Sequence, residues 1–154
     1  MYKKILFPTD GSENSKRANK HVLWIADKSG ADIILLYVVD PHFPRLATTL
    51  PISTLPTPDE NFYQEIRTEG KQIIEDFKQE LEDNQCKGKC KNVNLKTQIK
   101  EGRPYIEILK VIEEENIDLV VMGASGRHGL DRFVLGSVTE RVIREAQKPV
   151  LVAP

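Results

Sequence analysis

The chain has 154 residues, with 22 Lys and Arg against 23 Asp and Glu, and 40% of the residues are hydrophobic. This length suits one domain, and we expect residues 1–154 to form it. The net charge of −1 argues against a nucleic-acid-binding protein, whose surface would be basic. No apolar run approaches the ~18 residues of a membrane helix. The first ten residues lack the features of a secretory signal, so we expect a cytoplasmic protein with no nucleic-acid or membrane partner.

The first part of the chain alternates strand and helix patterns. The short apolar run Ile5–Phe7 ends in turn residues and predicts a strand. Apolar residues at helical spacing between Ser12 and Ser29 predict a helix, which Gly30 closes. The aliphatic and β-branched run Ile33–Val39 is typical of a strand that is buried on both faces of a parallel sheet.

The periodic pattern is interrupted at residues 40–58, where five of the nine prolines lie. A segment of this length without periodicity is usually functional or disordered. We interpret it as a mobile, variable loop on the outside of the fold, and a lid and a mere linker both remain open. Asp59 then predicts the cap of a long helix that runs to about Asp83. The acidic faces of this helix and the mostly basic stretch Lys87–Arg103 are interpreted as solvated surfaces.

The second part of the chain continues the alternation. Apolar and polar residues alternate over Val93–Ile99, which predicts a strand with one covered face, at an edge of the sheet. Pro104 suits the first turn of a helix. The apolar run Ile117–Met122 predicts another strand, Gly136–Ala146 a final helix, and Pro149–Ala153 a last strand.

These patterns together predict an α/β fold, with a doubly wound five-stranded parallel sheet and helices on both faces. Right-handed crossovers leave few arrangements of the strands. A flavodoxin-like or related doubly wound order is the leading expectation. In such sheets a ligand binds outside the carboxyl ends of the strands, where the strand order reverses.

Two cysteines, Cys86 and Cys90, lie in the segment CKGKC. They are too few and too close together for a disulfide framework. We expect two free thiols in a polar loop. A redox pair and a zinc site shared across a dimer remain as alternatives, although zinc requires four ligands and no other His or Cys lies nearby.

A glycine-rich segment, Gly123–Gly129, follows the fourth predicted strand, and Gly136 and Ser137 open the last helix. Glycines let a backbone approach a ligand closely, and exposed N–H groups bind anions. A helix N-terminus adds free donors and about half a positive charge. These parts predict a phosphate site. Ser137 suits either a donor to phosphate or a helix N-cap, and Arg127 and His128 either add positive charge or are solvated.

The two common phosphate-binding signatures are absent, because the chain has no Walker P-loop and no GxGxxG after its first strand. The pattern Gly123-x2-Gly126-x9-Gly136-Ser137 instead resembles the G-x2-G-x9-G-[ST] signature of the ATP-binding class of universal stress proteins. The resemblance extends over nearly the whole chain. It includes the segments Lys4–Ser12, Leu36–Asp40, Asp118–Gly123 and Lys148–Val152.

This resemblance implies a Rossmann-like fold of the adenine-nucleotide alpha-hydrolase type. It also implies a regulatory, stress-response module that binds ATP, with Mg or Mn held mainly by the phosphates, and that hydrolyses ATP slowly at most. The main chain at Val38 is the implied partner of the adenine. The implied ligand-binding residues are Pro8, Thr9, Asp10, Val38, Met122, Gly123, Gly126, Arg127, Gly129, Gly136, Ser137, Val138 and Thr139. A homodimer through the last strand, at Val150, Leu151 and Val152, is implied as well.

Asp10 ends the first strand, where a carboxylate would repel a triphosphate unless it faces the ribose or a metal ion intervenes. We therefore expect Asp10 to contact the ribose or a metal-bound water, with a purely turn-forming role as the alternative. No nucleophile lies beside a base, and the three histidines, His21, His42 and His128, are scattered, so no catalytic residue is predicted. A nucleotide-processing enzyme on the same scaffold and a dimeric scaffold that binds no nucleotide remain as alternatives.

Overall fold

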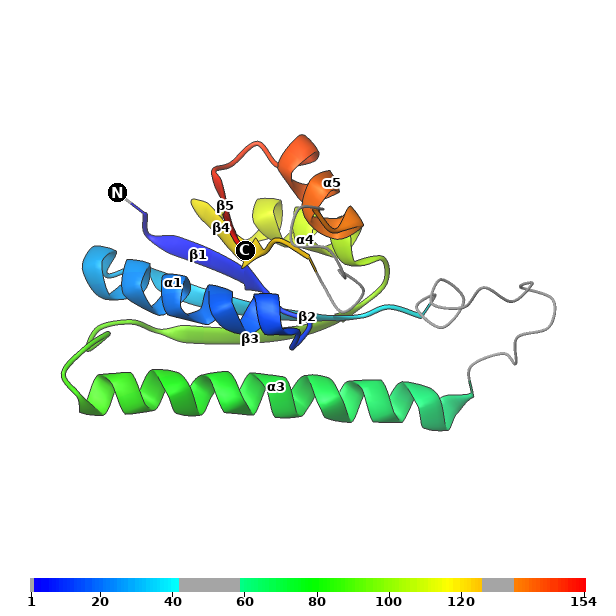
Figure 1. Ribbon diagram of the computed structural model, residues 1–154, viewed down its shortest axis with the longest axis horizontal. Coiled ribbons are helices and arrows are strands. Elements are labelled where there is room, and N and C mark those ends of the chain that lie inside the picture. Colours follow the sequence, from blue (N-terminus) through cyan, green and yellow to red (C-terminus); the bar gives the residue numbers. More distant parts are fainter. Residues whose placement is uncertain (1, 42–58, 126–134) are drawn as a thin grey trace.

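The computed structural model describes residues 2–41, 59–125 and 135–154 (Figure 1). Within these residues, strands and helices alternate along the chain and form a five-stranded parallel sheet with helices on both faces. The predicted fold class is confirmed. The elements are β1 (Lys4–Pro8), α1 (Glu13–Ser29), β2 (Asp32–Val39), α3 (Glu60–Cys86), β3 (Leu95–Glu101), α4 (Pro104–Glu114), β4 (Leu119–Gly123), α5 (Ser137–Glu145) and β5 (Val150–Ala153).

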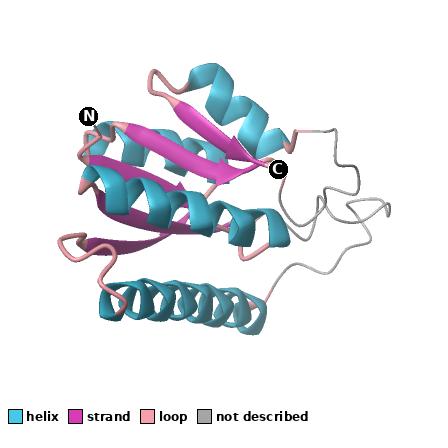
Figure 2. Ribbon diagram, turned by 60° about the vertical axis from the view of Figure 1, so that its left-hand side comes forward, coloured by secondary structure: helices cyan, strands magenta, loops and turns pink. Residues whose placement is uncertain are grey.

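The strand order is β3-β2-β1-β4-β5, and all neighbouring strands are parallel. Figure 2 shows the strands running in a common direction. This is the Rossmann-like member of the doubly wound orders, which confirms the predicted doubly wound sheet; of the orders expected, it is the one related to the flavodoxin-like order. The alternation of elements predicts parallel strands and right-handed crossovers, but it does not say on which side of β1 each later strand is added. The order reverses between β1 and β4, which makes their carboxyl ends the switch point of the sheet.

The helices cover the sheet in two layers, with α1 and α3 on one face and α4 and α5 on the other (Figure 1). The strands are nearly continuous apolar runs because both faces are covered. Alternate residues of one strand belong to opposite layers, as Leu35 and Leu36 of β2 do. β3 is an edge strand, as predicted, although Val93 precedes it.

The predicted helix ends are confirmed where capping chemistry specified them. The side chain of Ser12 accepts a hydrogen bond from the Ser15 N–H, and Gly30 ends α1 in the left-handed conformation with φ 70°. Asp59 accepts from the Phe62 N–H at 2.9 Å and caps α3. At the start of β1, Asp118 accepts from the backbone N–H groups of Lys3 and Lys4, and these bonds lower the pKa of its carboxyl.

The cysteine expectation is corrected in part. Cys86 is the last residue of α3, and Cys90 is a free thiol buried in the core at 3% exposure, so they do not share a polar loop. Burial raises the pKa of the Cys90 thiol, which disfavours the reactive thiolate. No cluster of three or more metal-binding side chains occurs among the described residues. No helix in the described part of the chain is long and apolar enough to span a membrane.

Candidate functional site

The turn that leaves β1 lies beside the switch point and is organised by Asp10. Asp10 Oδ1 accepts hydrogen bonds from the Ser12 N–H at 3.0 Å and from Ser15 Oγ at 2.7 Å. Gly11 has a φ of +74°, and the N–H of Gly11 donates to Thr9 Oγ1 at 3.2 Å. The turn-forming role of Asp10 is therefore present in the structure, because one carboxylate oxygen joins the end of β1 to the first turn of α1.

Two hydrogen bonds connect the start of α5 to the end of β4. The Gly136 N–H donates to the Ala124 carbonyl at 2.8 Å, and Thr139 Oγ1 donates to the Gly123 carbonyl at 3.0 Å. These bonds fix the N-terminus of α5 at the carboxyl end of β4. Of the predicted ligand-binding residues, Gly126, Arg127 and Gly129 lie outside the described residues, as does His128.

Packing by itself requires a glycine at position 123. A Cβ added at Gly123 would lie 2.8 Å from the carbonyl carbon of Asn14 and 2.9 Å from the backbone nitrogen of Ser15. Since these are main-chain atoms of α1, they cannot move aside without displacing the helix. The first turn of α1 therefore lies directly against the end of β4, and the β1–α1 turn and the β4–α5 segment become one structural unit.

Two residues that the sequence interpretation missed strengthen this unit. Asn14 Nδ2 donates to Ser125 Oγ at 2.6 Å and to the Ser125 carbonyl at 3.1 Å, and Ser125 is buried at 5% exposure. The two residues are more than a hundred positions apart, and neither shows a local signal. Predicting this contact requires the knowledge that β1 lies beside β4 in the sheet.

The main chain of Val38 extends past the end of β1. The register of β1 with β2 ends at Pro8 opposite Leu36, and the last bond runs from the Thr9 N–H to the Leu36 carbonyl. The N–H and C=O groups of one residue point to the same side of a strand, and this side alternates. Val38 therefore presents its main-chain donor and acceptor on the same side as Leu36, toward the switch point, where β1 has already turned away.

The N-terminus of α5 forms the other side of this region. Gly136 is the N-cap, with φ −63° and ψ 149°, and within the described residues no side chain caps the helix. The N-cap interpretation of Ser137 is wrong by one position, because Ser137 is the first helical residue and is exposed. The conformation of Gly136 is open to any residue, so the backbone angles do not require glycine there. An uncapped helix start supplies N–H donors and a positive partial charge, which suits an anion.

The predicted ligand-binding residues differ in exposure, and therefore in whether a ligand can contact their side chains. Pro8, Met122, Gly123 and Thr139 are buried within the sheet and its helices, and the hydroxyl of Thr139 is used in the bond to Gly123. The partly or fully exposed members are Thr9, Asp10, Val38, Gly136, Ser137 and Val138. The second group surrounds the carboxyl ends of β1, β2 and β4, where the sequence predicted the site.

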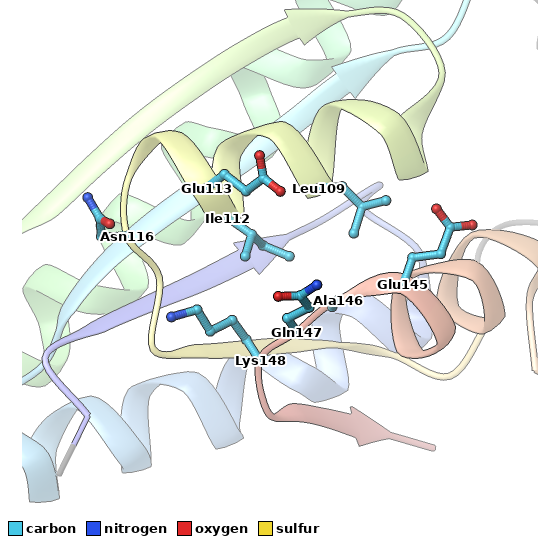
Figure 3. Close-up of a pocket in the computed structure, with 8 residues that line it drawn as sticks. All are labelled: Leu109, Ile112, Glu113, Asn116, Glu145, Ala146, Gln147 and Lys148. Atoms are coloured by element: carbon cyan, nitrogen blue, oxygen red, sulfur yellow. The ribbon is translucent and has the colours of Figure 1, made fainter.

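One pocket in the described part of the structure lies at the opposite end of the sheet. It has a volume of about 310 Å³ between the C-terminal part of α4 and the residues that follow α5 (Figure 3). Leu109, Ile112 and Ala146 line its floor, with charged and amide side chains around them. A second pocket of about 250 Å³ between α1 and α3 includes Thr9 and Gly11, on the face of the sheet away from α5. Neither pocket contains the N-terminus of α5.

Comparison with known proteins gives one family over the full sequence. The model of the universal stress protein family matches residues 1–154. The universal stress protein MJ0577 of Methanocaldococcus jannaschii is 38% identical over 160 residues, which cover 99% of this chain and 94% of that protein. A solved structure of MJ0577 superimposes with a TM-score of 0.77 at 37% identity, covering 99% of this chain and 96% of that one. UspA from Lactobacillus plantarum gives the same TM-score at 27% identity, with coverages of 99% and 98%.

Two more distant structures share the fold and carry nucleotides. A universal stress protein in complex with cAMP has a TM-score of 0.66 at 21% identity, covering 99% of this chain and 96% of that one. A universal stress family protein of Arabidopsis thaliana with AMP bound has a TM-score of 0.63 at 19% identity, with coverages of 98% and 90%.

The contact between Gly123 and α1 can be tested by a single methyl group. We expect Gly123→Ala to lower the free energy of unfolding by about 1–3 kcal/mol, because main-chain atoms of Asn14 and Ser15 must shift. Gly136→Ala is the matched control and should cost at most about 1 kcal/mol, since its backbone angles suit alanine. Urea denaturation measures both. Equal losses in the two variants would contradict the assigned packing role of Gly123.

Proposed function

The chain belongs to the universal stress protein family, and we propose that it is a regulatory module that binds ATP at the carboxyl ends of β1 and β4. The observation that carries this proposal is the placement of the uncapped N-terminus of α5 at the switch point of the sheet. An open parallel sheet binds ligands at that point, and a helix N-terminus binds phosphate. The family members with bound AMP and cAMP support an adenine nucleotide as the ligand class.

Each part of the region suits one part of the nucleotide. The main-chain donor and acceptor of Val38 suit the adenine, whose edge offers both kinds of group. Gly136 and Ser137, at the start of α5, suit the phosphates, which need N–H and hydroxyl donors. Gly126, Arg127 and Gly129 remain predicted members of the phosphate site, and the buried Pro8, Met122, Gly123 and Thr139 form its scaffold.

We propose a regulatory role rather than rapid catalysis. Among the described residues no cluster of carboxylates, histidines or cysteines could hold a metal ion. We propose that a magnesium or manganese ion is held mainly by the phosphates and that hydrolysis is slow at most, as the family resemblance implies. The cytoplasmic location stays a prediction.

The nucleotide proposal is tested by titration with Mg-ATP. We expect saturable binding to the wild-type chain and its loss in Gly136→Val, because a branched side chain at the helix N-cap would occupy the space of the phosphates. Isothermal titration calorimetry measures binding, and circular dichroism checks that the variant keeps its fold. Absence of wild-type binding at millimolar ATP would overturn the proposal. Formation of AMP from ATP in the presence of a second substrate would favour a nucleotide-processing enzyme instead.

The two roles of Asp10 can be separated by an isosteric change. Asp10→Asn keeps the oxygen that accepts from Ser12 and Ser15, so we expect the free energy of unfolding to change by no more than about 0.5 kcal/mol. Mg-ATP affinity should fall, because the proposed contact with the ribose or a metal-bound water requires the carboxylate. Asp10→Ala should lower both stability and affinity. If Asp10→Asn binds Mg-ATP with wild-type affinity, the proposed ligand contact of Asp10 is wrong and only its role in the turn stands.

We also propose a homodimer through β5. Hydrogen bonds from Val120 to the Pro149 carbonyl and from Ala124 to the Ala153 carbonyl show which side of β5 faces β4. Because orientation alternates along a strand, Val150 and Val152 present their main-chain groups at the outer edge, and Leu151 faces β4. Such an edge is a template for pairing with a second copy.

The dimer proposal predicts the effect of a proline at this edge. Val152→Pro removes an outward N–H and leaves the bonds to β4 in place, so we expect a folded monomer. Val152→Ala keeps the N–H and should remain dimeric. Light scattering coupled to size-exclusion chromatography gives the mass of each. A dimeric Val152→Pro or a monomeric wild-type protein would contradict pairing through β5.

A further inference from the structure

A cation–π pair joins the two helices on the α4 and α5 face of the sheet. The guanidinium carbon of Arg141 on α5 lies 4.5 Å from the centre of the Tyr105 ring on α4. This distance is within the range of a cation–π interaction. A cation–π attraction acts on the charge of the guanidinium and does not use its N–H groups in conventional hydrogen bonds, so these donors stay available for other partners. Tyr105 therefore orients Arg141 without consuming its capacity to bind an anion.

The pair stands near the proposed nucleotide site. Tyr105 lies in the first turn of α4, and it packs on the same apolar cluster as Val38 and Val138. Arg141 follows Ser137 by four residues on α5, so the two share one face of the helix. Helical side chains lean toward the N-terminus of their helix. The side chain of Arg141 thus extends over the first turn of α5, toward the end where the phosphates are proposed to bind.

Arg141 also differs from its neighbour in how its charge is balanced. Arg144 forms an ion pair with Glu140 at 2.5 Å on the same helix. Within the described part of the chain, Arg141 forms no ion pair with a carboxylate, and its guanidinium contacts the Tyr105 ring. An oriented guanidinium without a carboxylate matches the planar, bidentate geometry of phosphate recognition.

We propose that Arg141, held by Tyr105, binds the phosphates of the nucleotide and makes affinity depend on their number. The inference rests on the proposed function, since it assigns a contact within that same site. It selects nucleoside di- and triphosphates over monophosphates. The helix N-terminus can donate hydrogen bonds to any phosphate, so the selectivity for the longer phosphate chains comes from the additional side chain, Arg141. Tyr105 is a positioning residue, because it acts through Arg141.

The test compares AMP, ADP and Mg-ATP at fixed salt by calorimetry. Arg141→Gln should weaken Mg-ATP binding roughly tenfold and AMP binding less than about twofold, because charge-assisted bonds to the outer phosphates are lost. Arg144→Gln is the matched control, with the same change on the same helix, and should bind all three like the wild type. Tyr105→Phe should also resemble the wild type, whereas Tyr105→Leu should lose part of the preference for ATP over AMP.

The outcomes separate this inference from the proposed function. If the wild type binds Mg-ATP but Arg141→Gln keeps the wild-type ratio of ATP to AMP affinity, the role of Arg141 is overturned and the proposed function stands. If the wild type binds no adenine nucleotide, the proposed function fails and this inference fails with it. Arg141→Lys is a second variant, which keeps the charge and loses the planar fork. We expect an intermediate ATP preference, and full wild-type discrimination would overturn the bidentate contact.

Discussion

The pairing of β1 with β4 is the contact on which the rest of the structure depends. It places Ile5 opposite Leu119 and Leu6 opposite Val120, although these residues are far apart in the sequence. The strand order reverses at this pair, so the chain leaves β1 toward one face of the sheet and β4 toward the other. The starts of α1 and α5 are thereby brought to one place. The proposed site, made of a β1 turn and an α5 N-terminus, depends on these two strands being neighbours.

The absence of a side chain at Gly123 allows this arrangement to close. Main-chain atoms of Asn14 and Ser15 lie where a Cβ would be, so α1 begins directly against the end of β4. Hydrogen bonds from Asn14 to Ser125 and from Thr139 to Gly123 then tie both helices to the same strand end. A glycine in a phosphate-binding signature thus also has a purely structural role. For a buried residue of this signature such as Gly123, packing is a sufficient reason for the residue type, with or without a ligand.

The sequence predicted local structure well where capping and periodicity specify it, as at Ser12, Gly30 and Asp59. It predicted the parallel sheet, because strands buried on both faces have no polar alternation. The alternation of elements limited the strand order to the doubly wound group, and it did not by itself choose the Rossmann-like order over the flavodoxin-like one, since short connections permit both. Asn14, Ser125, Tyr105 and Arg141 were missed for the same reason: each acquires its partner from another part of the chain. The proposed ligand comes from the resemblance to a family, because periodicity alone cannot name a ligand.

The central claim is that the nucleotide binds at the carboxyl ends of β1 and β4 and not in the 310 Å³ pocket at the opposite end of the sheet. Amide chemical shifts of the ¹⁵N-labelled protein during titration with Mg-ATP test this most directly. We expect the largest changes to cluster at Asp10, Val38 and Ser137. Changes that centre on Asn116, Gln147 and Lys148 would contradict it.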